Sequence, residues 1–131
     1  MPRQHISGGS SFEDQIGYCR AVVLEDGWIH VSGTTGYDYA TGEISPDVAQ
    51  QAEQTLRNID KALREAGSSM ADAVRVRYIL PDRDDFPTTW PVLKAWFGDV
   101  RPAATMIQAV LMKEEMKIEI EVTARKGSGK Q

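Results

Sequence analysis

The chain has 131 residues, with 15 Lys and Arg against 19 Asp and Glu, and a formal net charge of −4. Hydrophobic residues make up 41% of it and charged residues 26%, which excludes a disordered, collagen-like or coiled-coil chain and predicts one domain around a single core. The acidic balance argues against nucleic acid as a partner, because affinity for the phosphate backbone depends on clustered Lys and Arg.

Cysteine usage and hydropathy predict a soluble, cytoplasmic protein. Cys19 is the only cysteine and so has no partner for an internal disulfide. The first residues contain no apolar segment of the kind that a secretory signal needs. The longest apolar run, residues 109–112, is far shorter than the roughly 20 residues that cross a bilayer, and no membrane contact is expected.

Residues 18–33 predict a β-hairpin. Two runs rich in β-branched and aromatic residues flank Asp26-Gly27, a favoured turn pair because glycine tolerates a positive φ. Alternation along the second run places Trp28, His30 and Ser32 on one face of the predicted strand.

A helix is predicted to follow, capped by Ser45 and closed by Gly67. Pro46 suits its first position, where a missing N–H costs nothing. Apolar or small residues recur every three or four positions and form one stripe: Val48, Ala52, Leu56, Ile59, Leu63 and Ala66. This stripe predicts a helix with one buried face.

The second half of the chain predicts three strands and one helix. Residues 73–80 alternate, with Arg75 and Arg77 facing away from the apolar side. Residues 104–112 and 117–124 also favour strands, and we expect these two to pair antiparallel.

The apolar spacing over residues 86–97 favours a helix, but Pro87 and Pro91 predict that it is broken or starts late. The resulting order, ββαβαββ, predicts an α+β two-layer sandwich: a mostly antiparallel sheet with two helices on one face. Residues 1–12 and 125–131 are expected to be irregular or frayed.

Among candidate catalytic groups, Glu119 and Glu121 share one face of the last strand. Two neighbouring carboxylates that lose solvent raise one pKa and can supply an acid or a base. The alternative is a solvated strand edge, with Lys117 and an arginine as partners. Cys19 is more typical of a small buried hydrophobic residue than of a thiol nucleophile. No spacing of His, Cys, Asp or Glu predicts a metal site.

Several short segments, taken in order, resemble the RidA/YjgF family. They are Gly17-Tyr18-Cys19-Arg20-Ala21-Val22, Val31-Ser32-Gly33, Thr41-Gly42-Glu43-Ile44, Gln54-Thr55-Leu56-Arg57-Asn58-Ile59, Ala66-Gly67, Pro102-Ala103-Ala104-Thr105 and Ile118-Glu119-Ile120-Glu121. Each segment alone is weak, but their order and spacing extend over nearly the whole chain.

The resemblance implies a chorismate-mutase-like α+β fold in a homotrimer, with a small-molecule ligand in each cleft between subunits. It implies hydrolysis of reactive enamines and imines to 2-oxo acids and ammonia, without a metal or cofactor. Older labels for the family include endoribonuclease and translation inhibitor, which the acidic charge of this chain does not favour.

The resemblance also implies roles for matching residues. Glu119 matches the residue that holds or activates the attacking water, and Tyr18, Ser32 and Gly33 match residues of the cleft. Thr34 replaces the glutamine that usually follows Ser-Gly in the family.

Two cleft positions depart from the family pattern. Ala104 stands where deaminating members have an arginine that binds the substrate carboxylate, and Trp90 replaces an asparagine. Arg20 and Arg101 are the nearest candidates to supply the missing cation, and exposed structural arginines are the alternative. Three functions follow as hypotheses: an imine or enamine hydrolase, a trimer that binds an apolar or aromatic metabolite without catalysis, and an RNA-cleaving protein.

Overall fold

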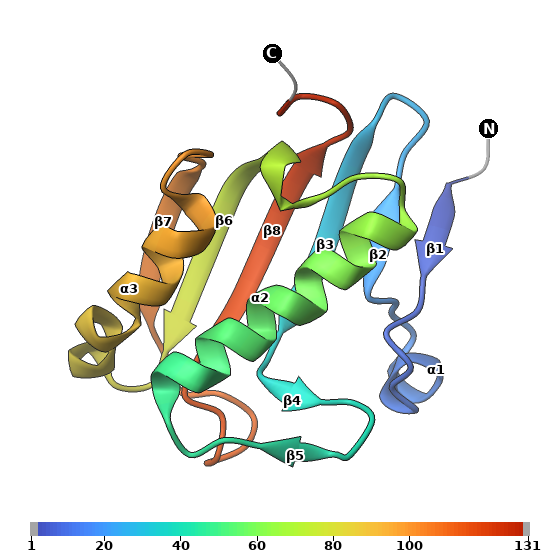
Figure 1. Cartoon of the computed structure of the whole chain (residues 1–131). Coiled ribbons are helices and arrows are strands. Elements are labelled where there is room, and N and C mark those ends of the chain that lie inside the picture. The colour runs from blue at the N-terminus through green and yellow to red at the C-terminus, as the bar shows by residue number, and fades with distance from the viewer. Residues whose placement is uncertain (1–2, 130–131) are drawn as a thin grey trace.

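The computed structural model describes residues 3–129 and consists of a six-stranded sheet with helices on one face (Figure 1). The sheet order is β1 (Gln4–Ile6), β2 (Ala21–Val23), β3 (Trp28–Thr34), β8 (Glu119–Arg125), β6 (Ala73–Leu80) and β7 (Ala103–Gln108). Neighbouring strands are antiparallel except β6 and β7, which are parallel. The α+β prediction is therefore confirmed.

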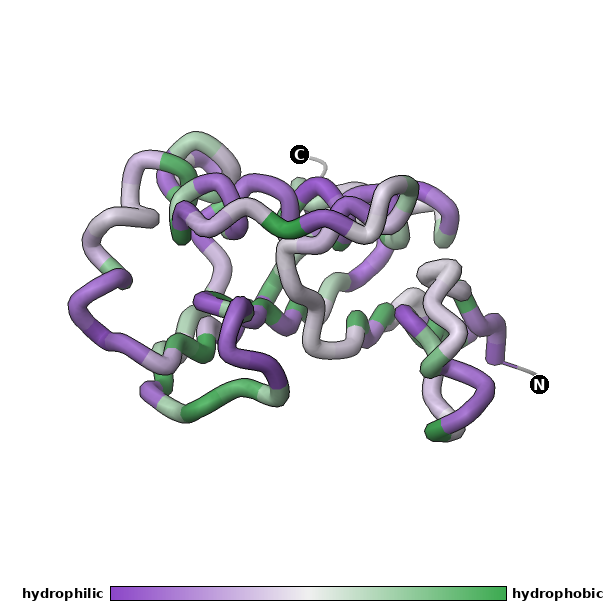
Figure 2. The backbone as a smooth tube through the Cα atoms, turned by 90° about the horizontal axis from the view of Figure 1, so that it is seen from below, coloured by the Kyte–Doolittle hydropathy of each residue, from purple (hydrophilic) through white to green (hydrophobic). Residues whose placement is uncertain are grey.

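The remaining elements are short, apart from the two covering helices. They are α1 (Phe12–Ile16), the small hairpin β4 (Tyr37–Asp38) and β5 (Glu43–Ile44), α2 (Val48–Glu65), the 3₁₀ turns η1 (Met70–Asp72) and η2 (Arg83–Asp85), and α3 (Phe86–Phe97). Figure 2 shows the helical layer and the sheet layer from below. No described helix combines the length and the apolar character that a membrane crossing requires.

The core lies between α2 and the centre of the sheet. The predicted stripe of α2 is buried, with Leu56, Ile59 and Leu63 fully out of solvent. Ile120 and Val122 of the central strand β8 are buried in the same core. The apolar spacing of the helix thus matches the alternation of the strand beneath it.

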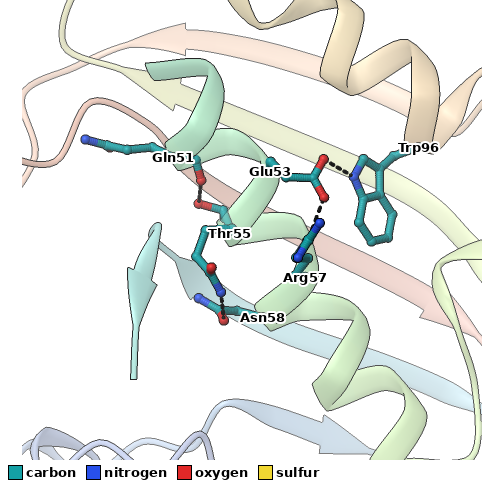
Figure 3. A network of polar contacts seen from close by, with 7 residues as sticks. Gln51, Glu53, Thr55, Arg57, Asn58 and Trp96 are labelled. Atoms are coloured by element: carbon teal, nitrogen blue, oxygen red, sulfur yellow. Dashed lines mark hydrogen bonds and ion pairs between the residues drawn. The ribbon is translucent and has the colours of Figure 1, made fainter. Parts of the chain in front are cut away.

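Polar contacts fix α2 at its ends and against α3. Its N-cap is Asp47 rather than Ser45, because the Asp47 carboxylate accepts the Gln50 N–H at 2.9 Å. At the other end Gly67 adopts φ 83°, as predicted for the residue after the C-cap. Near α3, the indole N–H of Trp96 donates to the Glu53 carboxylate at 3.0 Å (Figure 3).

The expected antiparallel pairing of the last two strands is wrong. β7 instead runs parallel to β6, and β8 lies between β3 and β6. The physical reason is burial: alternate residues of β8 are all buried, which suits a central position, whereas β7 is exposed along most of its length and forms the edge. The crossover through α3 makes β6 and β7 parallel.

The expectation of a broken or late-starting helix is also wrong, since α3 runs without interruption from Phe86. Pro87 lies in the first turn, where no N–H is needed. Pro91 lies inside the helix on its exposed side, where the loss of one helical N–H does not interrupt α3. Leu93 and Phe97 are buried and anchor the helix on the core.

The ends of the chain are more ordered than residues 1–12 and 125–131 were expected to be. β1 pairs with β2, and Arg125 belongs to β8. The backbone N–H groups of Gly127 and Gly129 donate to the Asp72 carboxylate at 3.1 and 2.9 Å. The outermost positions of the two predicted irregular ends lie outside the described residues.

Candidate functional site

The carboxyl group of Glu119 lies against Gly33. Glu119 begins β8 on the sheet face away from α2, and the register between β3 and β8 shifts between Val31 and Thr34. A Cβ atom at position 33 would lie 2.5 Å from Oε2 of Glu119. Glycine at this position therefore leaves the space that the carboxyl group occupies.

Glu119 lines a hollow of about 420 Å³, here called the Glu119 hollow. Aromatic side chains from three segments form much of its wall: Phe12, Tyr18, Tyr37 and Tyr39. Two cations, Arg20 and Lys113, also line it. A concave, largely apolar site with a few converging polar groups is the usual form of a small-molecule site.

The pKa of Glu119 is raised above its usual value. Burial is the main cause, and the neighbouring charge of Glu121 adds to it, whereas the Arg20 guanidinium acts in the opposite direction. No ion pair within 4 Å involves Glu119 among residues 3–129. A half-buried carboxylate of this kind is a stronger base than an exposed one and can accept a proton from water.

Arg20 is 5% exposed and holds the segment that faces Glu119. Its Nη1 donates to the Gly33 carbonyl at 2.8 Å and to the Thr34 hydroxyl at 3.1 Å. The guanidinium also lies 5.7 Å from the centre of the Tyr18 ring. Arg20 therefore fixes the backbone at Gly33 and supplies positive potential near Glu119.

Thr34 does not line the Glu119 hollow. It is 1% exposed, and its hydroxyl donates to the Ser32 carbonyl at 2.8 Å. Ser32 in turn donates from Oγ to the Cys19 carbonyl at 2.6 Å. Ser32 and Cys19 line a second hollow, which shares Tyr18 with the first. Cys19 is half-buried just before β2, so its interpretation as a buried strand residue is wrong.

Three further predicted site residues lie away from the Glu119 hollow of the same chain. Trp90 is 56% exposed on α3, where its ring contacts Phe86 edge to face. Ala104 is exposed on the edge strand β7. Arg101 has a left-handed backbone with φ 53°, and its Nε donates to the Gly98 carbonyl at 3.1 Å.

Glu121 is the solvated member of the carboxylate pair. It lies 3.7 Å from Arg77, and both side chains are about 40% exposed. The partner is thus an arginine, as the alternative interpretation expected, but β8 is a central strand and not an edge. The two carboxylates therefore differ in environment although they share a face.

The sequence did not point to Lys113, Tyr37 or Tyr39, because all three come from segments without a periodic pattern. Two polar residues of α2 place these segments. Asn58 donates to the Tyr37 carbonyl at 2.8 Å, and Gln51 donates to the Glu115 carbonyl at 2.8 Å. Figure 3 shows both side chains on α2. Polar residues on a helix face directed into the protein are the one sequence signal for this role.

Residues 3–129 hold no cluster of three or more His, Cys, Asp or Glu side chains that could hold a metal ion. The site consists of one half-buried carboxyl group, aromatic walls and two cations. Such a set can hold a polar organic molecule and move a proton.

Comparison with known proteins identifies the family of this chain. The model of the family described as Endoribonuclease L-PSP matches residues 9–126. The chain belongs to this family, known as RidA/YjgF. Among curated members, a 2-iminobutanoate/2-iminopropanoate deaminase of Rattus norvegicus is 34% identical over 113 residues, covering 86% of this chain and 82% of that protein. The corresponding protein of Bos taurus is 35% identical with the same coverage.

Solved RidA/YjgF structures share the fold. A YjgF/YER057c/UK114 family member from Mycobacterium tuberculosis superposes with a TM-score of 0.86 at 34% identity, covering 95% of this chain and 99% of that one. Escherichia coli TdcF with bound serine gives a TM-score of 0.78 at 29% identity, with 84% and 88% coverage. The fold and family expectations from the sequence are confirmed.

Proposed function

We propose that this RidA/YjgF protein hydrolyses imines or enamines, with Glu119 as the general base. The observation that carries the proposal is the half-buried Glu119 carboxyl, with a raised pKa, in the aromatic hollow. Relatives that are about one-third identical bear the name 2-iminobutanoate/2-iminopropanoate deaminase. An enamine reaches the same reaction after it tautomerises to the imine.

In the proposed reaction, the oxygen of a water molecule bonds to the carbon of the C=N group. Glu119 takes a proton from that water and passes it to the nitrogen, which gives a tetrahedral carbinolamine. Glu119 then takes the hydroxyl proton of the carbinolamine and delivers it to the nitrogen as the C–N bond breaks, so that ammonia leaves and a carbonyl remains. Tyr18 lines the hollow beside the reacting group. The raised pKa suits Glu119 to both transfers.

We propose that the working unit is a homotrimer with its ligands in clefts between subunits. Exposed apolar residues on and after the edge strand support this: Met106 is 53% exposed, Val110 84% and Met112 89%. An uncovered apolar edge is typical of an interaction surface. In such an assembly Trp90, Ala104 and Arg101 would act on the hollow of a neighbouring subunit.

The replacement of the family arginine by Ala104 limits the proposed substrate range. Without a bidentate guanidinium, a small imino acid loses a charge-assisted contact worth about 1.5–3 kcal/mol or more. We expect 2-iminobutanoate to bind about a hundredfold more weakly than to a member with the arginine. Larger imines, held by other contacts, are the better candidates.

The test generates 2-imino acids in the cuvette and measures how far the protein reduces their trapping by semicarbazide. An amino-acid oxidase supplies aliphatic and aromatic imines, and a threonine dehydratase supplies 2-iminobutanoate. Wild-type protein should accelerate hydrolysis of at least one imine, Glu119→Gln should abolish this, and Glu121→Gln on the same face should retain it. Equal activity of wild type and Glu119→Gln would overturn the proposal.

A trimer that binds metabolites without catalysis is the second candidate, favoured by the exposed apolar Trp90 and by Ala104. If no imine is hydrolysed, if Ala104→Arg creates no activity, and if thermal-shift screening finds ligands without a carboxylate, this candidate replaces the first. RNA cleavage, which the family description names, has less support from a chain of net charge −4.

A further inference from the structure

Four aromatic side chains gather in the wall of the Glu119 hollow. Phe12, Tyr18 and Tyr39 are between 36% and 50% exposed, and Tyr37 lies half-buried beside them. These rings come from α1, from the segment before β2 and from the β4 region, so they gather only in the folded chain. Exposed rings around one concave site offer stacking surface to a flat ligand.

The two cations of the hollow are engaged differently. Arg20 is buried, and its Nη1 donates hydrogen bonds to the Gly33 carbonyl and the Thr34 hydroxyl. Its Nε is buried as well and has no hydrogen-bond partner in the described chain. Hydrogen bonds within the chain therefore hold the Arg20 guanidinium in place, and it cannot rotate freely toward a ligand.

Lys113 is the cation that is free to meet a ligand. Its ammonium group lies 6.0 Å from the centre of the Phe12 ring and 5.9 Å from that of Tyr37. Lys113 is exposed, and its ammonium group has no ion-pair partner within 4 Å among residues 3–129. The hydrogen bond from Tyr37 is the main cause of a lowered pKa of the Glu115 carboxyl, and the charge of Lys113 helps to lower it. The nearby Glu115 carboxylate accepts the Tyr37 hydroxyl at 2.9 Å.

The loop that carries Lys113 is held in place. The fully buried Gln51 donates to the Glu115 carbonyl and accepts the Lys117 N–H, both at 2.8 Å. These bonds tie residues 115–117 to α2. An anion placed against Lys113 therefore meets a cation on a supported loop, beside aromatic rings and on the same hollow as Glu119.

We propose that the Glu119 hollow takes 2-imino acids with an aromatic side chain, the ring packing on Tyr37 and Tyr39 and the carboxylate binding Lys113. The inference rests on the proposed function and names its substrate class. Water and the aromatic 2-imino acid give the aromatic 2-oxo acid and ammonia. Ala104 cannot bind the substrate carboxylate. Lys113, in the connection between β7 and β8, supplies that contact instead.

The test measures binding rather than turnover, by calorimetry on the full chain. Phenylpyruvate is the probe, 2-oxobutanoate is its aliphatic counterpart and phenylacetone is its counterpart without a carboxylate. We expect phenylpyruvate to bind at least about tenfold more tightly than either, since each loses one of the two contacts. Equal affinity for the two oxo acids would overturn the ring contact.

Variants separate the two contacts. Lys113→Met should weaken phenylpyruvate about tenfold and leave phenylacetone unchanged, whereas the control Lys94→Met on α3 should change neither. Tyr39→Ala should reduce the preference for phenylpyruvate over 2-oxobutanoate. Unchanged phenylpyruvate affinity in Lys113→Met would overturn the assignment of the carboxylate contact.

The outcome is distinct from that of the proposed hydrolysis. Tight phenylpyruvate binding that depends on Lys113, in a protein without imine turnover, would support the proposed binding site and contradict the proposed hydrolase activity. Hydrolysis of 2-iminobutanoate without any preference for aromatic imino acids would retain the hydrolase and reject the substrate class.

Discussion

The Glu119 carboxyl occupies the space that a side chain at position 33 would fill, with Oε2 only 2.5 Å from where a Cβ would lie. The two residues come from neighbouring strands whose register shifts at this point. The bulge and the glycine together make room for a polar group on an otherwise regular sheet face.

Gly33→Ala should therefore displace the Glu119 carboxyl and reduce imine hydrolysis at least about tenfold, because a misplaced base loses its alignment with water. The measurement is kcat from the trapping assay, with thermal denaturation to show that the variant folds. Gly33→Ala with wild-type kcat would show that the close approach has no catalytic role.

The pH dependence of hydrolysis should report Glu119 as a base. Activity should rise as pH increases through the raised pKa of Glu119 and then level off, because only the ionised carboxylate accepts a proton. Glu121→Gln removes a like charge and should shift this rise in activity to lower pH. Arg20→Gln removes the opposing cation and should shift it to higher pH. Shifts of kcat/KM profiles in the same direction for both variants would contradict the assignment.

Stability should respond to the same carboxyl. The folded pKa of Glu119 lies above its usual value, so the folded state binds more protons and its stability falls as pH rises through that range. Glu119→Gln should thus melt at a higher temperature than wild type at pH 7, with the difference narrowing under acidic conditions. A lower melting temperature at pH 7 would mean that the carboxylate is stabilising.

Gln51 offers a test of how the loop with Lys113 is held. Its side chain is fully buried and bonds the Ser45 carbonyl, the Glu115 carbonyl and the Lys117 N–H. Gln51→Leu leaves these backbone groups unpaired and should cost about 2–3 kcal/mol in the free energy of unfolding. Denaturant titration measures this cost, and the exposed Gln50→Leu is its control. A cost below that of the control would show that the loop does not depend on Gln51.

Much of the fold was predicted from the alternation of apolar residues in strands and from their spacing of three or four in helices. The alternation of residues 117–124 correctly placed Glu119 and Glu121 on one face, because facing is a local property of a strand. The partners of that strand were not predictable in the same way. They depend on how residues 109–118 return the chain to the centre of the sheet, and this segment has no periodic pattern.

The site was predictable only where it lies on regular elements or matches a family motif. Glu119, Tyr18 and Gly33 were identified in this way and line one hollow. Lys113 and Tyr37 lie far apart in the sequence and meet across a loop. That contact cannot be predicted from either residue alone, because it depends on buried Gln51 and half-buried Asn58, which hold the two segments against α2.

The proposed trimer gives the final prediction. Light scattering should give about three times the 14.5 kDa of the chain, because an exposed apolar edge such as that of β7 and the following loop is typical of a subunit interface. Met106→Asp places a charge on this edge and should produce monomers, whereas Ile16→Asp, at a site that is 71% exposed on α1, should leave the assembly intact. If the wild-type chain is monomeric at micromolar concentration, the edge is not a subunit interface, and Ala104 and Trp90 have no route to the Glu119 hollow.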